Sequence, residues 1–516
     1  MTHTPTVASE RETGAKGLST NAVGLLGAVI IGISCIAPAY TLTGALGPTV
    51  AAVGTALPGI FLVGFIPMLL TAFGYKELVT SMPDSGTSFT WGVRAFGPWI
   101  GWMSGWGLVI ATIVVLSNLA GIAVDFFYLA VAQVFNQEWI AALKDNVAVN
   151  VITCLAFMAV ATAISYRDMQ TTQRFQYILV TFQLIIMVGF GGVMMWQAYN
   201  GSGFNFTPIE LSWFNPFNVD SFGTFAAGIS LSLFIFWGWD VTLTMSEETK
   251  GGRSTPGKAA TLTIIAVVSI YLFVSLGAMS YAGVGDEGIG LGNPAIQENV
   301  FFALATPVLG TGAILMSLAV LSSSAASLQS TFVSPARTLL AMGHYGAISP
   351  KFARVSPRFF TPSYATFVSA IVASVFYAVM RVLSENVLWD TIATLGIMIA
   401  FYYGLTAFAC VWYFRKQWFA SARNFFFQFL FPLIGGIILF ILLVQTMVES
   451  IDPAFGSGSQ IGGIGLVFIL GMLMLGAGVV LMFYCYIRFP DFFKGKTLVK
   501  GLPEDENAGL AKELAE

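Results

Sequence analysis

The sequence predicts an all-α polytopic membrane protein of about twelve transmembrane helices, and composition, run length and charge distribution each support that prediction. Of its 516 residues, 56% are hydrophobic and only 9% are charged, whereas a soluble domain carries about 25% charged residues. Most of the surface of such a chain cannot face water. The net charge of −3 gives no reason to expect a nucleic-acid partner.

Runs of about 20 mainly apolar residues recur along the chain, and a run of that length crosses a bilayer as a helix. Helices are expected because lipid offers no partners to backbone polar groups. An even number of spans would place both ends of the chain on one side of the membrane. The expected spans lie near residues 22–47, 53–74, 98–131, 147–166, 174–197, 222–246, 259–283, 306–340, 363–382, 389–414, 424–447 and 463–487.

The basic residues divide unevenly between the two sides of this topology. If the chain begins inside, all of its 23 lysines and arginines except Lys144 and Arg381 lie on the inner side. Cytoplasmic loops carry an excess of basic residues, and one missed span would invert every loop after it. We therefore expect a multi-pass protein of the cell membrane, with cytoplasmic tails at residues 1–20 and 491–516 around a transmembrane region at 21–490.

Two of the expected spans contain a signal for a break near the middle of the membrane. In the first span, Pro38 lacks a backbone N–H and should end the helix just before it, and Gly32 permits local unwinding. In the sixth span, Gly238 lies close to the carboxylate of Asp240. Proline and glycine also form ordinary kinks in membrane helices, so either signal alone has a plain structural explanation.

The two signals correspond in position if the chain contains two inverted halves of five spans each. These halves are residues 21–197 and 222–416, followed by two extra helices within residues 424–487. Transporters built in this way bind substrate near the midplane, where one helix in each half is interrupted. The correspondence favours a binding site over two unrelated kinks.

The interrupted helices would present free amides and carbonyls to a cavity. The amides suit a carboxylate and the carbonyls suit an ammonium group, so a zwitterion fits both. Aromatic rings can close over a bound amine, although the same rings can simply pack between helices. The residues expected to contact substrate are Ser34, Cys35, Ile36, Ala37, Phe236, Trp237, Gly238 and Trp239.

Asp240 is the most informative acidic residue, because a carboxylate at membrane depth is costly and usually functional. Desolvation favours its protonated form and suggests proton coupling, whereas a position near cytoplasmic water or at the cap of a helix is the alternative. Glu247 and Glu248 lie at the cytoplasmic end of the same span. We expect this pair to form gating contacts with Lys250, Arg253 or inner-loop arginines.

The remaining polar residues of the spans leave the coupling ion open between a proton and sodium. Ser323 and Ser324 form a candidate cation site, although membrane serines more often bond their own helix. The four cysteines lie in apolar runs, and the chain has only two histidines. No metal, cofactor or catalytic triad is therefore expected, and the chain is not expected to be an enzyme.

Three stretches of the chain resemble the amino acid–polyamine–organocation family of transporters. Residues 83–91 (PDSGTSFTW), with the following FGP and GW motifs, are similar to the family's inner loop before helix three. Residues 234–256 resemble its helix-six signature, with an acidic residue after glycine-aromatic and a later glutamate pair. Residues 334–350 resemble the end of helix eight and its loop. The resemblance spans roughly residues 20–490 and implies the LeuT-like inverted-repeat fold.

The resemblance implies ion-coupled uptake, usually with a proton, of an amino acid or an amine. The helix-one break departs from the glycine-rich form of many members and is similar to members with a proline there, including putrescine-type importers. We therefore expect a permease that imports an amino acid by proton symport, with a polyamine or other amine as the alternative. A channel and a membrane enzyme are weaker alternatives, because the spans lack a charged pore and a catalytic cluster. A non-transporting sensor is a further, less favoured alternative, which accumulation of labelled substrate in proteoliposomes would distinguish from a carrier.

Overall fold

The computed structural model describes residues 13–167, 169–383, 387–455 and 457–501, and the outer parts of both predicted tails lie outside these ranges. The long helices and the two segments after the breaks are α1 (Leu25–Ile36), α2 (Pro38–Val53), α3 (Leu57–Ser81), α5 (Pro98–Phe135), α7 (Val147–Ser165), α8 (Met169–Tyr199), α9 (Phe222–Ile235), α10 (Val241–Thr244), α11 (Thr255–Ala282), α13 (Ile314–Thr331), α14 (Val333–His344), α15 (Ser363–Leu383), α16 (Val387–Tyr413), α18 (Phe431–Glu449) and α19 (Leu466–Arg488).

Shorter elements connect these helices and lie mostly at the two ends of the bundle. The short helices are α4 (Ser88–Phe96), α6 (Glu138–Ala141), α12 (Val300–Leu309), α17 (Ala422–Asn424) and α20 (Pro490–Phe493). The single-turn segments are η1 (Gly54–Ala56), η2 (Ala142–Asp145), η3 (Leu211–Phe214), η4 (Ser246–Glu248), η5 (Gln297–Asn299), η6 (Gly310–Gly312), η7 (Pro350–Ala353), η8 (Phe425–Leu430) and η9 (Pro453–Phe455). The strands β1 (Gln460–Ile461) and β2 (Ile464–Gly465) pair antiparallel in one small hairpin.

The described helices match the predicted spans in order. Ten helical runs within the described ranges are long and apolar enough to cross a membrane. One of them, Leu25–Ser81, is 57 residues long and holds the first two predicted spans. The sixth predicted span is absent from the ten because its break limits α9 to 14 residues. The predicted all-α polytopic architecture is confirmed.

The predicted start of the eighth span is wrong by several residues. The apolar run near residue 306 belongs to a separate helix, α12, which ends before Gly310. Gly310 has φ 56°, a conformation that glycine adopts at little cost and that stops a helix. The spanning helix α13 begins only at Ile314. The hydropathy pattern does not separate the two helices, because the residues between them are also uncharged.

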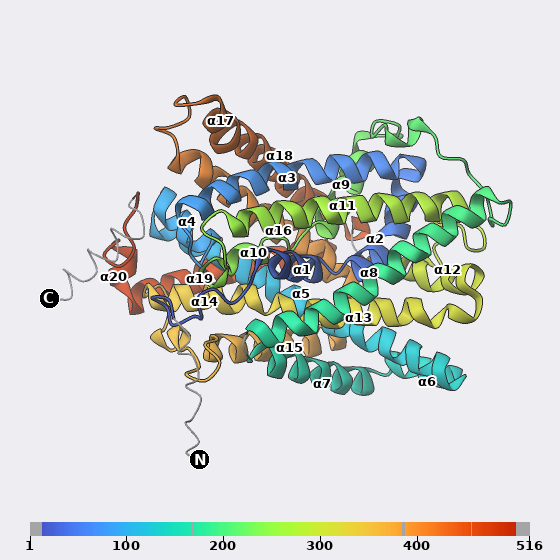
Figure 1. The fold of residues 1–516 in the computed structure, drawn as a ribbon, viewed down its shortest axis with the longest axis horizontal. Coiled ribbons are helices and arrows are strands. Elements are labelled where there is room, and N and C mark those ends of the chain that lie inside the picture. Colours follow the sequence, from blue (N-terminus) through green and yellow to red (C-terminus); the bar gives the residue numbers. More distant parts are fainter. Residues whose placement is uncertain (1–12, 168, 384–386, 456, 502–516) are drawn as a thin grey trace, which may run out of the picture.

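The long helices lie side by side along the longest axis of the molecule, with α4, α14 and α20 toward one end and α6 and α12 toward the other (Figure 1). α5 is the central helix, because 89% of its most apolar window is buried, against 28% for α7 and for α19. Both described ends of the chain pack at the end that holds α4. Lys16 contacts Asp84 just before α4, and the Gly501 amide donates to the Arg94 carbonyl within it.

Candidate functional site

The first span is broken where the sequence predicts. α1 ends at Ile36 and α2 begins at Pro38, with Ala37 between them in the left-handed region at φ 56° and ψ 62°. Pro38 explains the position, because it lacks an N–H and keeps the residue before it out of the helical region. Ile36 and Ala37 are both buried, and tight packing is needed to hold a non-glycine residue in this conformation, which costs of order 1–3 kcal/mol.

Gly32 does not unwind the first span. It lies within α1, and a Cβ atom there would come within 2.6 Å of the Thr263 hydroxyl oxygen and 2.8 Å of the Thr242 methyl carbon. The glycine therefore allows α1 to approach α10 and α11 closely. The expectation of unwinding at Gly32 is wrong, because a sequence does not distinguish a flexible glycine from one that makes room for a neighbour.

The second break meets the first one. α9 ends at Ile235 and α10 begins at Val241, and Gly238 between them has φ 108°. A Cβ atom on Gly238 would lie 3.1 Å from the carbonyl carbon of Cys35 and 3.2 Å from its sulfur. The backbone of the sixth span thus rests against the last turn of α1, which brings the two predicted breaks together.

Asp240 is the acidic residue at this meeting point, and its side chain is 4% exposed. Tyr403 donates a hydrogen bond to one carboxylate oxygen at 2.9 Å, and Tyr402 donates to the other at 3.2 Å. The indole N–H of Trp237 donates to the Tyr402 hydroxyl oxygen at 2.6 Å. Among the described residues, no cation pairs with Asp240. The arrangement can therefore hold a proton or receive the amine of a ligand.

Phe236 and Trp239, the other two aromatic residues expected to contact substrate, both pack against other aromatic rings. Phe236 is fully buried between Phe65 and Tyr271, with both ring centroids 5.7 Å away. Trp239 is also fully buried and packs edge-on against Tyr75 at 5.1 Å. The Trp239 indole N–H is buried without a hydrogen-bond partner in the described part of the chain. Phe236 therefore has the geometry of a packing residue, whereas Trp239 retains an unused donor.

Ser34 faces away from the sixth span and toward α8 and α13. Its hydroxyl donates to the Gln176 side-chain oxygen at 2.5 Å and accepts from Ser330 at 3.1 Å. The Gln176 amide nitrogen donates to the carbonyl of Ala326 at 2.9 Å and also bonds to Gln329. These buried amides join three helices beside the first break. Neither glutamine was predicted as a site residue, although two glutamines inside apolar runs are a usable signal.

The carbonyl groups freed at the first break are partly satisfied by α13. The Ser327 hydroxyl donates to the Cys35 carbonyl at 2.9 Å. Ser323 accepts a 3.4 Å hydrogen bond from the backbone N–H of Tyr40, whereas Ser324 donates to carbonyls of its own helix. Of the two serines expected to bind a cation, only Ser323 therefore faces the broken first span.

A cavity of about 420 Å³ lies toward the end of the bundle opposite α4. Phe234 lies between this cavity and the first break, since it lines the cavity and its ring packs edge-on against Tyr40 at 6.2 Å. The Tyr40 hydroxyl is buried and has no hydrogen-bond partner among the described residues. The Tyr40 hydroxyl and the Trp239 indole N–H are thus two buried polar groups near the breaks that have no hydrogen-bond partner among the described residues. The cavity is lined by Pro48, Ala52, Leu231, Phe234, Gln297, Ile392, Ala393, Gly396, Thr446, Ala454 and Phe455.

The opposite end of the bundle is closed by a buried ion cluster of Lys16, Asp84 and Glu247, which we call the Lys16 cluster. The Lys16 ammonium lies 2.5 Å from an Asp84 oxygen and 2.7 Å from a Glu247 oxygen. The Ser85 amide donates to Glu247, and the Tyr345 hydroxyl donates to Asp84. Burial would raise the pKa of Asp84, but the Lys16 charge and these donors hold that pKa well below its usual range. The cluster ties the N-terminal segment to the connection between α3 and α4 and to the connection between α10 and α11.

Glu248 forms a second buried ion pair at the same end. Its carboxylate lies 2.5 Å from the Nε atom of Arg337. Burial raises the pKa of Glu248, and the Arg337 charge opposes the rise. The ion-pair partners are thus Arg337 of α14 for Glu248 and Lys16 for Glu247. Lys16 was not among the partners predicted from the sequence.

Comparison with known proteins identifies the family that the sequence matches. The sequence model of a family described as "Amino acid permease" matches residues 22–475. The low-affinity putrescine importer PlaP of Escherichia coli K12 is 23% identical over 432 residues, covering 83% of this chain and 88% of that protein. The methylthioribose transporter of Bacillus subtilis is 27% identical, covering 67% and 72%. The branched-chain amino acid permease BcaP of the same organism is 21% identical, covering 60% and 65%.

Proposed function

The chain belongs to the amino acid permease family, and from that premise we propose that it imports an amino acid across the cell membrane by alternating access around the two helix breaks. The contact of Gly238 with Cys35 carries this proposal. Irregular backbone at membrane depth is tolerated only where it is buried in protein or lines a cavity. Two breaks that meet fit the midplane site of carriers built from repeats.

The polar groups around the breaks support a ligand that carries an amine. Asp240 is buried without a cation among the described residues, so its charge needs either a proton or a bound ammonium group. In the first turn of α2, Pro38 has no N–H and the Tyr40 amide donates to Ser323, which leaves the Ala39 amide to bind a carboxylate. An amino acid uses both features. Two relatives are named for putrescine and for branched-chain amino acids, and an amine that uses Asp240 alone is the second candidate.

The two ends of the bundle support entry of substrate from the end that holds the cavity. Phe234, which lines the 420 Å³ cavity, packs against Tyr40 just after the first break, whereas the Lys16 cluster and the Glu248–Arg337 pair occupy the other end. With the cluster end in the cytoplasm, as the distribution of basic residues favours, substrate enters from outside. We further propose that the two inverted halves rearrange during transport and that the coupling ion is a proton carried by Asp240, with sodium near Ser323 as the alternative.

A competition panel on reconstituted protein tests the proposal. Purified chain in proteoliposomes is given a pH gradient, and uptake of a labelled neutral amino acid is measured against unlabelled amino acids, polyamines and sugars. The proposal expects accumulation that only amine-bearing compounds inhibit, with amino acids stronger than polyamines. Inhibition by polyamines alone would move the assignment to the amine, and no accumulation of any compound under any ion gradient would remove the transport function.

A further inference from the structure

A groove of about 670 Å³ runs along the outside of the bundle between α7 and α15, away from both helix breaks. The two helices pack against each other and lie side by side at the lower edge of Figure 1. Volumes of this size accommodate a ligand of several hundred daltons. The groove is open to the outside of the bundle, since four of its apolar lining residues are between 42% and 62% exposed. These residues are Leu155, Phe367, Ile371 and Val375.

The floor of the groove is apolar. Met158 and Ala370 are buried there, and the small side chains of Ala159 and Ala163 leave the space open. On the α7 side of the floor, Thr162 contributes a hydroxyl, which donates to the carbonyl of Met158 at 2.6 Å. Because that hydroxyl is already bonded within its helix, the floor suits a hydrocarbon chain better than a polar ligand.

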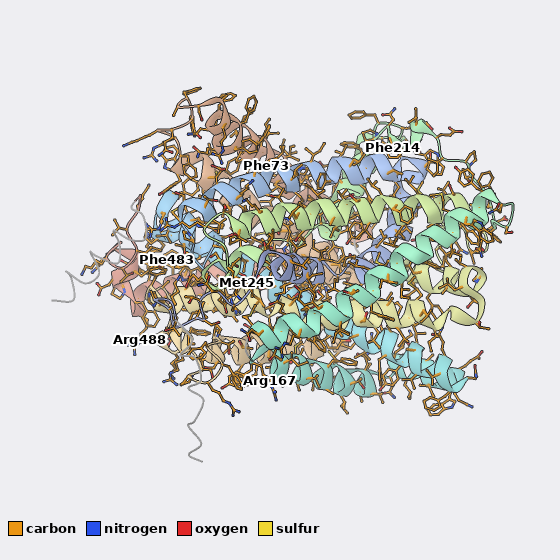
Figure 2. All side chains as sticks on the ribbon, in the orientation of Figure 1. Phe73, Arg167, Phe214, Met245, Phe483 and Arg488 are labelled. Carbon is orange, nitrogen blue, oxygen red and sulfur yellow. The ribbon has the colours of Figure 1, made fainter. Side chains whose placement is uncertain are left out.

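One end of the groove is aromatic and cationic. The Tyr166 ring packs against Phe359 at 5.4 Å and against Phe367 at 5.3 Å, and Arg167 completes the lining (Figure 2). The guanidinium of Arg358 lies 5.2 Å from the centre of the Phe359 ring. Both arginines are exposed, and neither forms an ion pair with any residue that the structure describes. Asp168, which follows Arg167, lies outside the described residues.

We propose that this groove binds an anionic phospholipid of the cytoplasmic leaflet, with an acyl chain along α7 and α15 and the phosphate on Arg167 and Arg358. Charge complementarity selects this occupant, because an apolar groove with one exposed guanidinium in its lining, and a second over the ring of a lining residue, matches a hydrocarbon chain joined to an anion. The cytoplasmic leaflet is the anionic one. The inference rests on the proposed orientation of the bundle, since the end of α7 must then lie at the cytoplasmic surface.

Native mass spectrometry of the purified full-length chain tests the proposal without measuring transport, so its failure is distinct from a failure of the proposed function. The chain is equilibrated in detergent with equal amounts of phosphatidylglycerol and phosphatidylcholine of identical chains. Phosphatidylglycerol is expected to be retained preferentially. Replacing both Arg167 and Arg358 with glutamine should lower that preference by on the order of 25-fold, about fivefold for each arginine.

Two further variants test whether lipid retention depends on the groove itself or on the general charge of the surface. Ala163→Leu fills the groove without changing charge and should reduce retention of phosphatidylglycerol. Arg415→Gln removes an exposed arginine from the segment that leads from α16 to α17, and should leave the preference unchanged. Figure 1 places α17 on the opposite edge of the bundle from α7 and α15. Equal retention of the two lipids, or a preference that survives the double arginine variant, would overturn the proposal. So would cross-linking of two copies through a cysteine at Val375, which would make the groove an interface between chains.

Discussion

Replacing Lys16 with glutamine is expected to open the end of the bundle that the Lys16 cluster closes. The substitution keeps most of the side-chain volume but leaves two carboxylates, on Asp84 and Glu247, facing each other without a cation. The Lys16 and Asp84 side chains are 2% and 0% exposed, whereas Glu247 is 16% exposed. Water can therefore not solvate the Asp84 carboxylate unless the connections that carry Asp84 and Glu247 move apart.

The size of the effect follows from the burial of the pair. Removing one partner of a buried ion pair costs about 3–5 kcal/mol, and the partial exposure of Glu247 places this case at the lower end of that range. A loss of about 3 kcal/mol changes the ratio of closed to open forms on the order of 100-fold. Adding Asp84→Asn to Lys16→Gln should recover part of the loss, because the stranded buried charge is then removed.

Hydrogen–deuterium exchange measures this change directly. The amides of Ala22 and Ser85, which donate to Glu248 and Glu247, should exchange faster in the Lys16→Gln variant by up to the same factor. Lys144→Gln is the matched control, because its pair with Asp145 is exposed and worth at most about 1 kcal/mol. Unchanged exchange at both amides in Lys16→Gln would refute the reasoning.

The pH dependence of amide protection near the Lys16 cluster tests the role of the Asp84 carboxylate independently. The pKa of Asp84 is depressed in the folded chain, so its contribution is fully present above the ordinary aspartate pKa of about 3.9. That contribution is lost only as the pH falls through the lower folded value. Protection of the Ser85 amide, corrected for the intrinsic exchange rate, should therefore be flat between about pH 5 and pH 8.

Three further predictions concern the breaks and the topology. Gly238→Ala should abolish uptake in an inserted protein, as measured with labelled substrate, because a Cβ at φ 108° would be strained and lie 3.1 Å from Cys35; normal uptake would contradict the contact. Saturating substrate should slow alkylation of Cys35 but not of Cys485 in the last span, and an unchanged Cys35 rate would remove α1 from the site. An impermeant reagent outside cells should label a cysteine placed at Asp286 but not one at Lys496, and equal labelling would refute the topology.

The sequence predicts the fold of this protein well because lipid imposes strong constraints on a chain. Run length and the distribution of basic residues define the spans, and Pro38 defines the first break through covalent geometry alone. Gly238 is recoverable in the same way, because glycine beside a carboxylate in an apolar run has few structural explanations. The contact between the two breaks is expected only from the proposed inverted halves, and the structure places Gly238 against Cys35.

The partners of the predicted residues are much harder to obtain from the sequence. Tyr402 and Tyr403 lie more than 160 residues after Asp240, and nothing local indicates that the tenth span turns its tyrosines toward the sixth. Lys16 belongs to a polar segment that composition alone describes as a tail. Gln176 and Ser34 meet only because α1 and α8 cross beside α13. These pairings depend on helix rotation and packing, which hydropathy does not encode.

The most direct test of the central claim is the accumulation of substrate by the Asp240→Asn variant in proteoliposomes under an imposed pH gradient. Asp390→Asn is the matched control, because Asp390 is equally buried but already accepts hydrogen bonds from the amide and hydroxyl of Ser457 near the β1–β2 hairpin. The account predicts that Asp240→Asn inserts normally and loses gradient-driven accumulation, whereas Asp390→Asn retains it. Accumulation by Asp240→Asn at the wild-type rate, with the wild-type dependence on pH, would contradict the account.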